Sequence, residues 1–125
     1  MIPPSPSDDL RFTGGRNIAL KLPPRLFDAT LAFYRDTLRL PVLEEFRPHQ
    51  VIEFGQNHLW LDPVEGLAAA EIWLEVIASD LAAAKLHLAE AGVDRCDEIE
   101  TLPPGFEGFW IRSPSATVHL VCGSD

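Results

Sequence analysis

Residues 71–76 read EIWLEV, in which every second residue is Ile, Leu or Val, as in a strand with one buried face. Ser79 or Asp80 then caps a predicted helix, in which apolar residues recur at helical spacing until Gly92 ends it. Shorter extended segments are predicted after the helix, at residues 95–100, 108–112 and 117–121. The second half of the chain therefore has the order strand, helix and three strands.

The first half of the chain has the same order. Residues 17–22 (NIALKL) alternate in the same way, and Ile18 lies 54 residues before Ile72. Residues 25–38 predict a helix, because large apolar side chains recur on one helical face. Further strands are predicted at residues 42–46, 51–54 and 58–61, with turn residues between them. A duplicated β-α-β-β-β module predicts an α+β fold.

The composition is that of a globular protein. Hydrophobic residues make up 46% and charged residues 23% of the 125 residues, which excludes a disordered chain. The formal net charge of −9 argues against nucleic acid and anionic membranes as partners, because an acidic surface repels phosphates. No apolar stretch is long enough to span a bilayer, so we expect a cytoplasmic protein. Cys96 and Cys122 are predicted to be reduced thiols that pack as small hydrophobic side chains.

The beginning of the chain has a different composition from the rest. Residues 1–15 are rich in proline, serine and glycine and show no periodicity, so we expect a flexible N-terminal leader, with order beginning at Asn17. Residues 16–125 are predicted to form a single domain made of two modules, 16–66 and 67–125.

Three motifs follow one another along the chain. The first predicted helix contains FYRDTL at 33–38, residues 71–93 join an apolar strand to a helix that ends in AGV, and residues 108–114 read GFWIRSP. In type and order these motifs resemble the vicinal-oxygen-chelate superfamily, which comprises glyoxalase I, bleomycin-resistance proteins and extradiol dioxygenases. Members of that superfamily have a Phe-Tyr-x-x-x-Leu helix and a late strand with an Asp-Pro-x-Gly turn. The resemblance extends from Asn17 to Val121.

The resemblance implies that the two modules form curled mixed sheets around a ligand cavity, which we call the trough, with the helices on the outer face. It also implies a homodimer and a small-molecule ligand. Strand alternation then assigns each residue to one of the two faces. The set expected to face the helices is Ile18, Leu20, Leu22, Leu59, Leu61, Ile72, Leu74, Val76, Val118 and Leu120. The set expected to face the trough is Asn17, Ala19, Lys21, His58, Trp60, Asp62, Glu71, Trp73, Glu75, Thr117, His119 and Val121.

Metal-dependent members of the superfamily place a His or Glu ligand on the first and last strand of each module. The matching positions in this chain are Asn17, Trp60 or a neighbour, Glu71 or Trp73, and His119. Only His119 matches in both type and place, so we expect no catalytic metal and no cofactor. A displaced site for a divalent metal is the alternative. Its ligands would be His58, His119 and one of Glu53, Glu71 and Glu75.

Two tryptophans, Trp60 and Trp73, fall on the predicted trough side. They either pack in the interior or form an aromatic wall against which a flat ligand stacks. Lys21 and Glu75 occupy equivalent places in the two modules and predict a salt bridge across the trough. The predicted ligand-binding residues are Asn17, Lys21, His58, Trp60, Trp73, Glu75 and His119. His49 and His87 are expected to face solvent.

Three functions are compatible with these observations. The first is metal-free binding of a small, planar organic molecule, in a protein that resembles the bleomycin-resistance type. The second is a lyase, isomerase or dioxygenase that uses the displaced metal. The third is a subunit whose trough is filled by its own tryptophans and whose role is assembly. A nucleophilic hydrolase is not indicated, because the sequence contains no Gly-x-Ser-x-Gly elbow.

Overall fold

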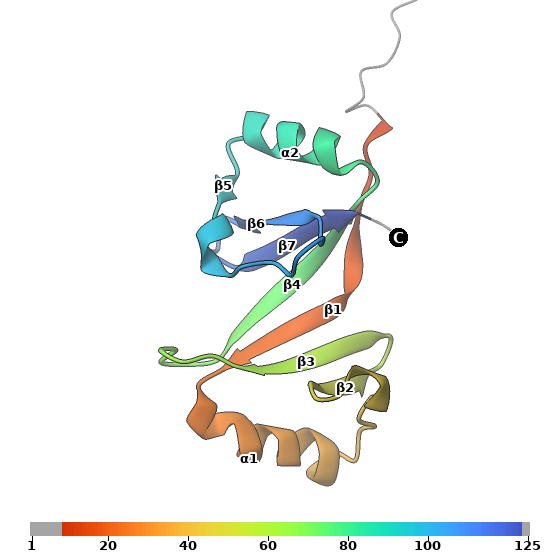
Figure 1. Cartoon of the computed structure of the whole chain (residues 1–125), viewed down its shortest axis with the longest axis vertical. Helices are drawn as coiled ribbons and strands as arrows, with labels where there is room; N and C mark the ends of the chain where they lie inside the picture. The colour runs from red at the N-terminus through yellow and green to blue at the C-terminus, as the bar shows by residue number, and fades with distance from the viewer. Residues whose placement is uncertain (1–8, 124–125) are drawn as a thin grey trace, which may run out of the picture. The chain divides into compact units, whose positions relative to one another are not determined.

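The computed structural model describes residues 9–123 (Figure 1). These residues form two compact units, and two strands have residues in both units. They are β1 (Phe12–Leu22) and β4 (Glu71–Ala78). The first unit comprises Arg16–Trp73, and the second unit comprises the described residues up to Gly15 together with those from Leu74 onward. Each unit has one α-helix on a mixed sheet, so the prediction of an α+β fold with two modules is confirmed.

The sheet of the first unit has the strand order β2-β3-β1. Strand β3 (Asn57–Pro63) runs parallel to β1 and antiparallel to β2 (Gln50–Phe54). These two strands confirm the predictions at residues 51–54 and 58–61.

A continuous helical stretch connects β1 to the following segment. It consists of a 3-10 turn at Pro24–Leu26, helix α1 (Phe27–Ala32) and a π-helical turn at Phe33–Thr37. Pro24 stands in the first turn, where the amide proton that proline lacks would have no partner within the helix. The helix predicted over residues 25–38 is therefore confirmed.

The core of the first unit lies between α1 and its sheet. Strands β1 and β3 contribute every second residue to it, as strand alternation requires. Because each buried leucine stabilises the fold by about 1.5–3 kcal/mol, this apolar face determines the register of both strands. The buried members are Leu20, Leu22, Leu31, Ile52, Leu59 and Leu61.

The sheet of the second unit has the strand order β4-β7-β6-β5. Strand β7 (Val118–Gly123) runs parallel to β4 and antiparallel to β6 (Gly108–Arg112). Strand β5 (Asp94–Arg95) is a short edge strand paired with β6. The strands predicted at residues 108–112 and 117–121 are thus present.

Helix α2 (Leu81–Glu90) begins at Asp80, whose Oδ1 accepts a hydrogen bond from the Ala83 N–H at 3.0 Å. Ser79, the other candidate cap, instead accepts a hydrogen bond from the Arg11 backbone N–H at 2.9 Å. Gly92 follows the helix with a φ of 76°, a left-handed conformation that glycine adopts without strain.

The register of β7 differs from the sequence prediction by one residue. Val121, which was expected to face the trough, is fully buried in the cluster that packs against α2. Ile111 belongs to the same cluster and pairs directly with His119, so His119 also lies on the α2 side of the sheet. Val118 and Leu120 therefore lie on the opposite face. The prediction failed because β7 is apolar on both faces, so its alternation defines no register.

Two predicted strands are absent or shortened. Residues 42–46 make a single bridge, between Val42 and Ile52, and then turn into a 3-10 helix at Glu44–Phe46. Residues 95–100 were expected to be extended, but β5 gives way to a 3-10 turn at Asp97–Ile99. There the Asp97 carboxylate accepts a backbone N–H from β6, which turns the chain away from the strand direction.

The predicted leader at residues 1–15 falls into two parts. Residues 1–8 lie outside the described residues, whereas β1 already begins at Phe12. The prediction that order begins at Asn17 is therefore wrong. At Gly15 in the start of this strand, an added Cβ would meet the side chain of Glu75, which would have to move to make room.

Among residues 9–123, no helix has the length and apolar character needed to cross a membrane.

Replacing Asp80 with alanine removes the cap of α2 and is expected to lower the free energy of unfolding by about 1 kcal/mol. Asp80→Asn keeps an oxygen for the Ala83 N–H and is expected to stay close to the parent chain. Chemical denaturation of the full chain measures both variants. Equal stability of Asp80→Ala and the parent chain would contradict the assigned cap.

Candidate functional site

Alternation along β1 and β3 creates a polar and aromatic face on the side of the first unit's sheet that lies opposite α1. We call it the β1–β3 face, and it carries Asn17, Lys21, His58, Trp60 and Asp62. Parallel pairing sets Asn17 opposite His58 and Lys21 opposite Asp62. The sequence analysis assigned all five residues to this side, so the predicted sorting of β1 and β3 is confirmed.

Asn17 and Trp60 are joined by a hydrogen bond on this face. The indole Nε1–H of Trp60 donates to Oδ1 of Asn17 at 2.8 Å. The bond satisfies the polar atom of a large ring that is partly buried, and it holds the ring in one orientation.

Two further rings contact Trp60 and His58. Phe46 lies with its ring centroid 5.0 Å from Trp60 and 5.3 Å from His58, and the His49 ring lies 5.6 Å from Trp60. Phe46 reaches this position because the chain turns at Glu44–Phe46 instead of continuing as a strand. Sequence analysis missed Phe46 for that reason. His49 is exposed, as predicted, although one side of its ring contacts Trp60.

Lys21 is a buried cation on the same face. Its side chain is 4% exposed, and Nζ forms an ion pair with Oδ2 of Asp62 at 2.5 Å. The ammonium also lies 4.2 Å from the ring centroid of Trp73, within the range of a cation–π interaction. Asp62 was placed on this face but was not identified as the partner of Lys21, which depends on the β1–β3 register. The predicted bridge from Lys21 to Glu75 stays a prediction.

Trp73 is only 7% exposed, which fits the packing role that the sequence left open. Trp60 is more accessible than Trp73 and offers the larger ring surface on the β1–β3 face.

Two predicted site residues lie in the second unit. The Glu75 side chain lies over Gly15, where an added Cβ would meet it. His119 lies on the α2 side, where it lines a cavity of about 380 Å³ beside the end of α2. Its Nδ1 lies 2.9 Å from the Thr117 carbonyl oxygen, so Nδ1–H donates and Nε2 is left as the other polar atom of the ring.

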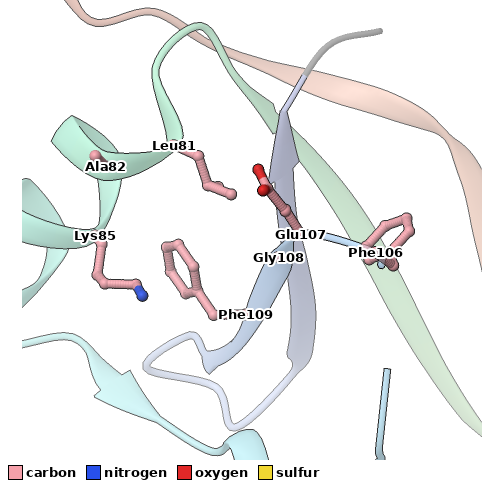
Figure 2. A pocket seen from close by; sticks show the side chains of 7 residues that line it. All are labelled: Leu81, Ala82, Lys85, Phe106, Glu107, Gly108 and Phe109. Carbon is pink, nitrogen blue, oxygen red and sulfur yellow. The ribbon is translucent and has the colours of Figure 1, made fainter. Parts of the chain in front are cut away.

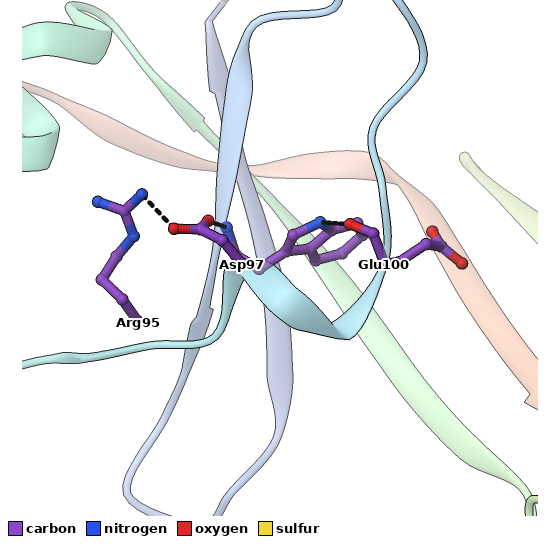
Figure 3. A network of polar contacts seen from close by, with 4 residues as sticks. Arg95, Asp97 and Glu100 are labelled. Atoms are coloured by element: carbon purple, nitrogen blue, oxygen red, sulfur yellow. Dashed lines mark hydrogen bonds and ion pairs between the residues drawn. The ribbon is translucent and has the colours of Figure 1, made fainter.

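Trp110 follows Phe109 in β6 and therefore lies on the face of the second unit's sheet opposite α2. A short polar network that includes Arg95, Asp97 and Glu100 fixes it (Figure 3). Its indole Nε1–H donates to the Glu100 carbonyl oxygen at 2.9 Å, and its backbone N–H donates to Oδ1 of Asp97 at 3.0 Å. The other carboxylate oxygen of Asp97 pairs with Arg95 at 2.5 Å. This network holds the Asp97–Ile99 turn against β6.

Burial, hydrogen bonds and nearby charges shift two pKa values at this turn. Partial burial raises the pKa of Asp97, but the hydrogen bond from Trp110 and the pairing with Arg95 outweigh it, so the net pKa lies below its ordinary value. Burial raises the pKa of the Cys96 thiol. Cys96 and Cys122 are both buried and free, as predicted.

No known family model matches the sequence, and no curated protein matches it. Solved structures do match. The Mn(II)-bound glyoxalase from Novosphingobium aromaticivorans has a TM-score of 0.64 and 21% identity, over 91% of this chain and 40% of that one. A glyoxalase/bleomycin resistance protein/dioxygenase superfamily member from Vibrio splendidus 12B01 has a TM-score of 0.55 and 14% identity, over 89% and 98%. A mutant of homoprotocatechuate 2,3-dioxygenase from Brevibacterium fuscum has a TM-score of 0.59 and 17% identity, over 99% and 36%.

The chain has the vicinal-oxygen-chelate fold. At these identities the likeness establishes the arrangement of helices and strands and leaves the reaction and the ligand open. The chain also spans only 40% of the length of the Novosphingobium glyoxalase.

At two of the expected metal positions, Asn17 and Trp60, the residues present are poor metal ligands. The Asn17 amide oxygen accepts the Trp60 N–H, and an indole is not a metal ligand. On β7 the imidazole of His119 lies on the α2 side, and the opposite face carries Val118 and Leu120. Within residues 9–123, no group of three or more His, Cys, Asp or Glu side chains is placed to hold a metal ion.

The lowered pKa of Asp97 predicts how stability depends on acid. A depressed carboxyl pKa contributes stability above the pKa of the unfolded state, and this contribution is lost as pH falls through the folded-state pKa. We expect Asp97→Asn to have a lower Tm than the parent chain near neutral pH, and the two to converge below about pH 4. Thermal unfolding across this pH range is the measurement. A constant difference in Tm at every pH would show that the Asp97 charge contributes nothing.

Proposed function

We propose that this chain binds a small, planar organic molecule on the β1–β3 face of its first unit, without a metal ion. The observation that carries the proposal is the Asn17–Trp60 hydrogen bond. It joins Asn17 to Trp60, which stand at or beside the first-module positions where the superfamily resemblance places metal ligands, and it uses the Asn17 oxygen to orient an aromatic ring. The chemistry available there is stacking and hydrogen bonding. The homodimer that the resemblance implies is part of this proposal.

The side chains around Trp60 support recognition of a flat ligand. Large rigid rings provide contact area at a low cost in conformational entropy, and Phe46 and His49 already contact the Trp60 indole at two places. A ligand ring can extend this cluster by stacking on the accessible part of Trp60.

The Lys21–Asp62 pair supplies fixed polar groups on the same face. Because Lys21 is buried against Trp73, its position is set by the fold and does not need to be ordered when a ligand binds. The Asp62 side chain is 42% exposed and can accept a hydrogen bond from a ligand substituent. The pair therefore suits a ligand that carries a polar group beside its ring.

The alternative is a metal-dependent lyase, isomerase or dioxygenase that uses His58, Glu71 and His119. The position of His119 in the second unit does not support it. Its β7 ligand, His119, lies on the α2 side of the sheet and not on the face opposite α2. We therefore propose no reaction step that runs through a metal.

Metal content tests the proposal directly. Protein purified without a metal-affinity column is expected to contain far less than one divalent metal per chain, and its Tm is expected to be unchanged by EDTA or by added Mn²⁺ or Zn²⁺. Elemental analysis and thermal unfolding measure both quantities. A near-stoichiometric metal that disappears in His58→Ala or Glu71→Ala would overturn the metal-free proposal.

Trp60 and Trp73 are expected to respond differently to truncation. A thermal-shift screen of planar aromatic compounds first identifies a probe, because selective binding raises the apparent Tm. Trp60→Ala is then expected to weaken binding of that probe about tenfold or more, for a lost stack of roughly 1–3 kcal/mol, taken by analogy from bases that stack on aromatic side chains. Trp73→Ala is expected to destabilise the chain by about 3–5 kcal/mol, as for an emptied core site.

The matched control is Trp60→Phe, which keeps a ring on the face and is expected to bind between the parent chain and Trp60→Ala. Denaturation of each variant separates loss of binding from loss of folding. If a folded Trp60→Ala variant binds the probe as tightly as the parent chain, or if no planar compound binds, the proposed site is wrong.

A further inference from the structure

The second unit contains a cavity of about 450 Å³ on the α2 side of its sheet, between the start of α2 and strand β6 (Figure 2). Its floor is Phe109, which is only 1% exposed, and Leu81 of α2 forms one wall. The proposed function does not use this cavity, because the β1–β3 face belongs to the first unit.

A tight turn leads into β6 and places Glu107 at the edge of the cavity (Figure 2). Phe106 N–H donates to the Pro103 carbonyl oxygen at 3.0 Å, and Gly105 has a φ of 81° at the position where a type II turn requires glycine. Gly108 follows, and a Cβ at that position would lie 3.1 Å from the Phe106 ring and 2.8 Å from the Val121 carbonyl oxygen. The missing side chain lets the Phe106 ring lie close to the strand beside Leu120, on the face opposite α2.

Two opposite charges lie at this cavity. Figure 2 shows Lys85 on α2 and Glu107 beside β6, with the Phe109 ring and the Leu81 side chain between them. The Lys85 ammonium lies 5.8 Å from the Phe109 ring centroid. Within residues 9–123, neither the Lys85 nor the Glu107 side chain has an ion-pair or hydrogen-bond partner.

We propose that this cavity binds a small zwitterion, a molecule with a carboxylate and an ammonium group on a short apolar body. The carboxylate pairs with Lys85, the ammonium pairs with Glu107, and the apolar body packs against Leu81 above the buried Phe109 ring. A ligand with one charge can pair with either Lys85 or Glu107 and leaves the other of these two side chains without a partner. The cavity is therefore expected to bind a zwitterion with higher affinity than an acid or an amine of the same size.

Titrations followed by NMR on the full chain test this proposal. The probes are 6-aminohexanoate and 4-aminobutanoate, each compared with the acid and the amine of the same chain length. We expect the zwitterions to shift the amide signals of Gly108 and Phe109 and to bind about two- to fivefold more tightly than the singly charged analogues, as for a pair of partly exposed charges.

Single and double variants assign the two charges. Lys85→Gln is expected to reduce the affinity of the zwitterion to that of the amine, and Glu107→Gln is expected to reduce it to that of the acid. The double variant Lys85→Glu/Glu107→Lys is expected to restore the preference, because the ligand can bind in the reverse orientation. Glu90→Gln, which removes an exposed charge of α2 outside the cavity, is the matched control and is expected to bind as the parent chain does.

Three outcomes would overturn the proposal. They are equal affinity for zwitterion, acid and amine in the parent chain, a preference that survives both single substitutions, and shifts confined to residues away from β6 and α2. Circular dichroism of each variant confirms that it is folded, so a lost preference cannot be mistaken for unfolding.

Discussion

The parallel pairing of β1 with β3 is the constraint on which the first unit depends. Because side chains alternate along both strands, the pairing that sets Leu20 against Leu61 on the α1 side also sets Lys21 against Asp62 on the other side. A shift of one residue would move a cation into the leucine core and bring leucines to the polar face. The same register therefore produces the core, the buried ion pair and the position of Trp60 beside Asn17.

The sequence predicts which face of a strand is buried only where one face is apolar and the other is polar. In β1 and β3 one side is leucine and isoleucine and the other carries Asn, Lys, His and Trp, so alternation alone assigned Asn17, Lys21 and Trp60 correctly. In β7 the residues around His119 are apolar on both faces, and Val118 and Val121 are both buried. Alternation then has two equally good solutions, and the sequence cannot choose between them. The pairing of β7 with β6, a contact between strands, decides the register.

The contacts of the candidate site that the sequence missed arise from the turn at residues 44–46 and from strand pairing. The apolar residues in 42–46 resemble a strand, but only Val42 bridges to β2, and the Leu43 N–H donates to the Val51 carbonyl oxygen at 2.8 Å. The chain then closes a 3-10 turn that brings Phe46 against Trp60. Local hydrogen bonds and a tertiary ring contact outweigh a weak strand propensity here. No pattern within 42–46 alone reveals this, because the decisive partner lies on β3.

The Asn17–Trp60 bond also shows how one fold supports different chemistry. The backbone of the vicinal-oxygen-chelate fold determines where the strand residues stand, whereas the atoms at those positions determine what can bind. A carboxylate or an unprotonated imidazole nitrogen has a lone pair to offer a cation; an indole offers an N–H and a ring face, and here the N–H is donated to the Asn17 oxygen. The two positions bond to each other: the indole has no lone pair to offer a cation, and the Asn17 oxygen uses one of its two lone pairs to accept the indole N–H. Likeness of fold to a Mn(II)-bound glyoxalase therefore does not by itself predict a metal in this chain, because side chains and not the fold supply the ligands.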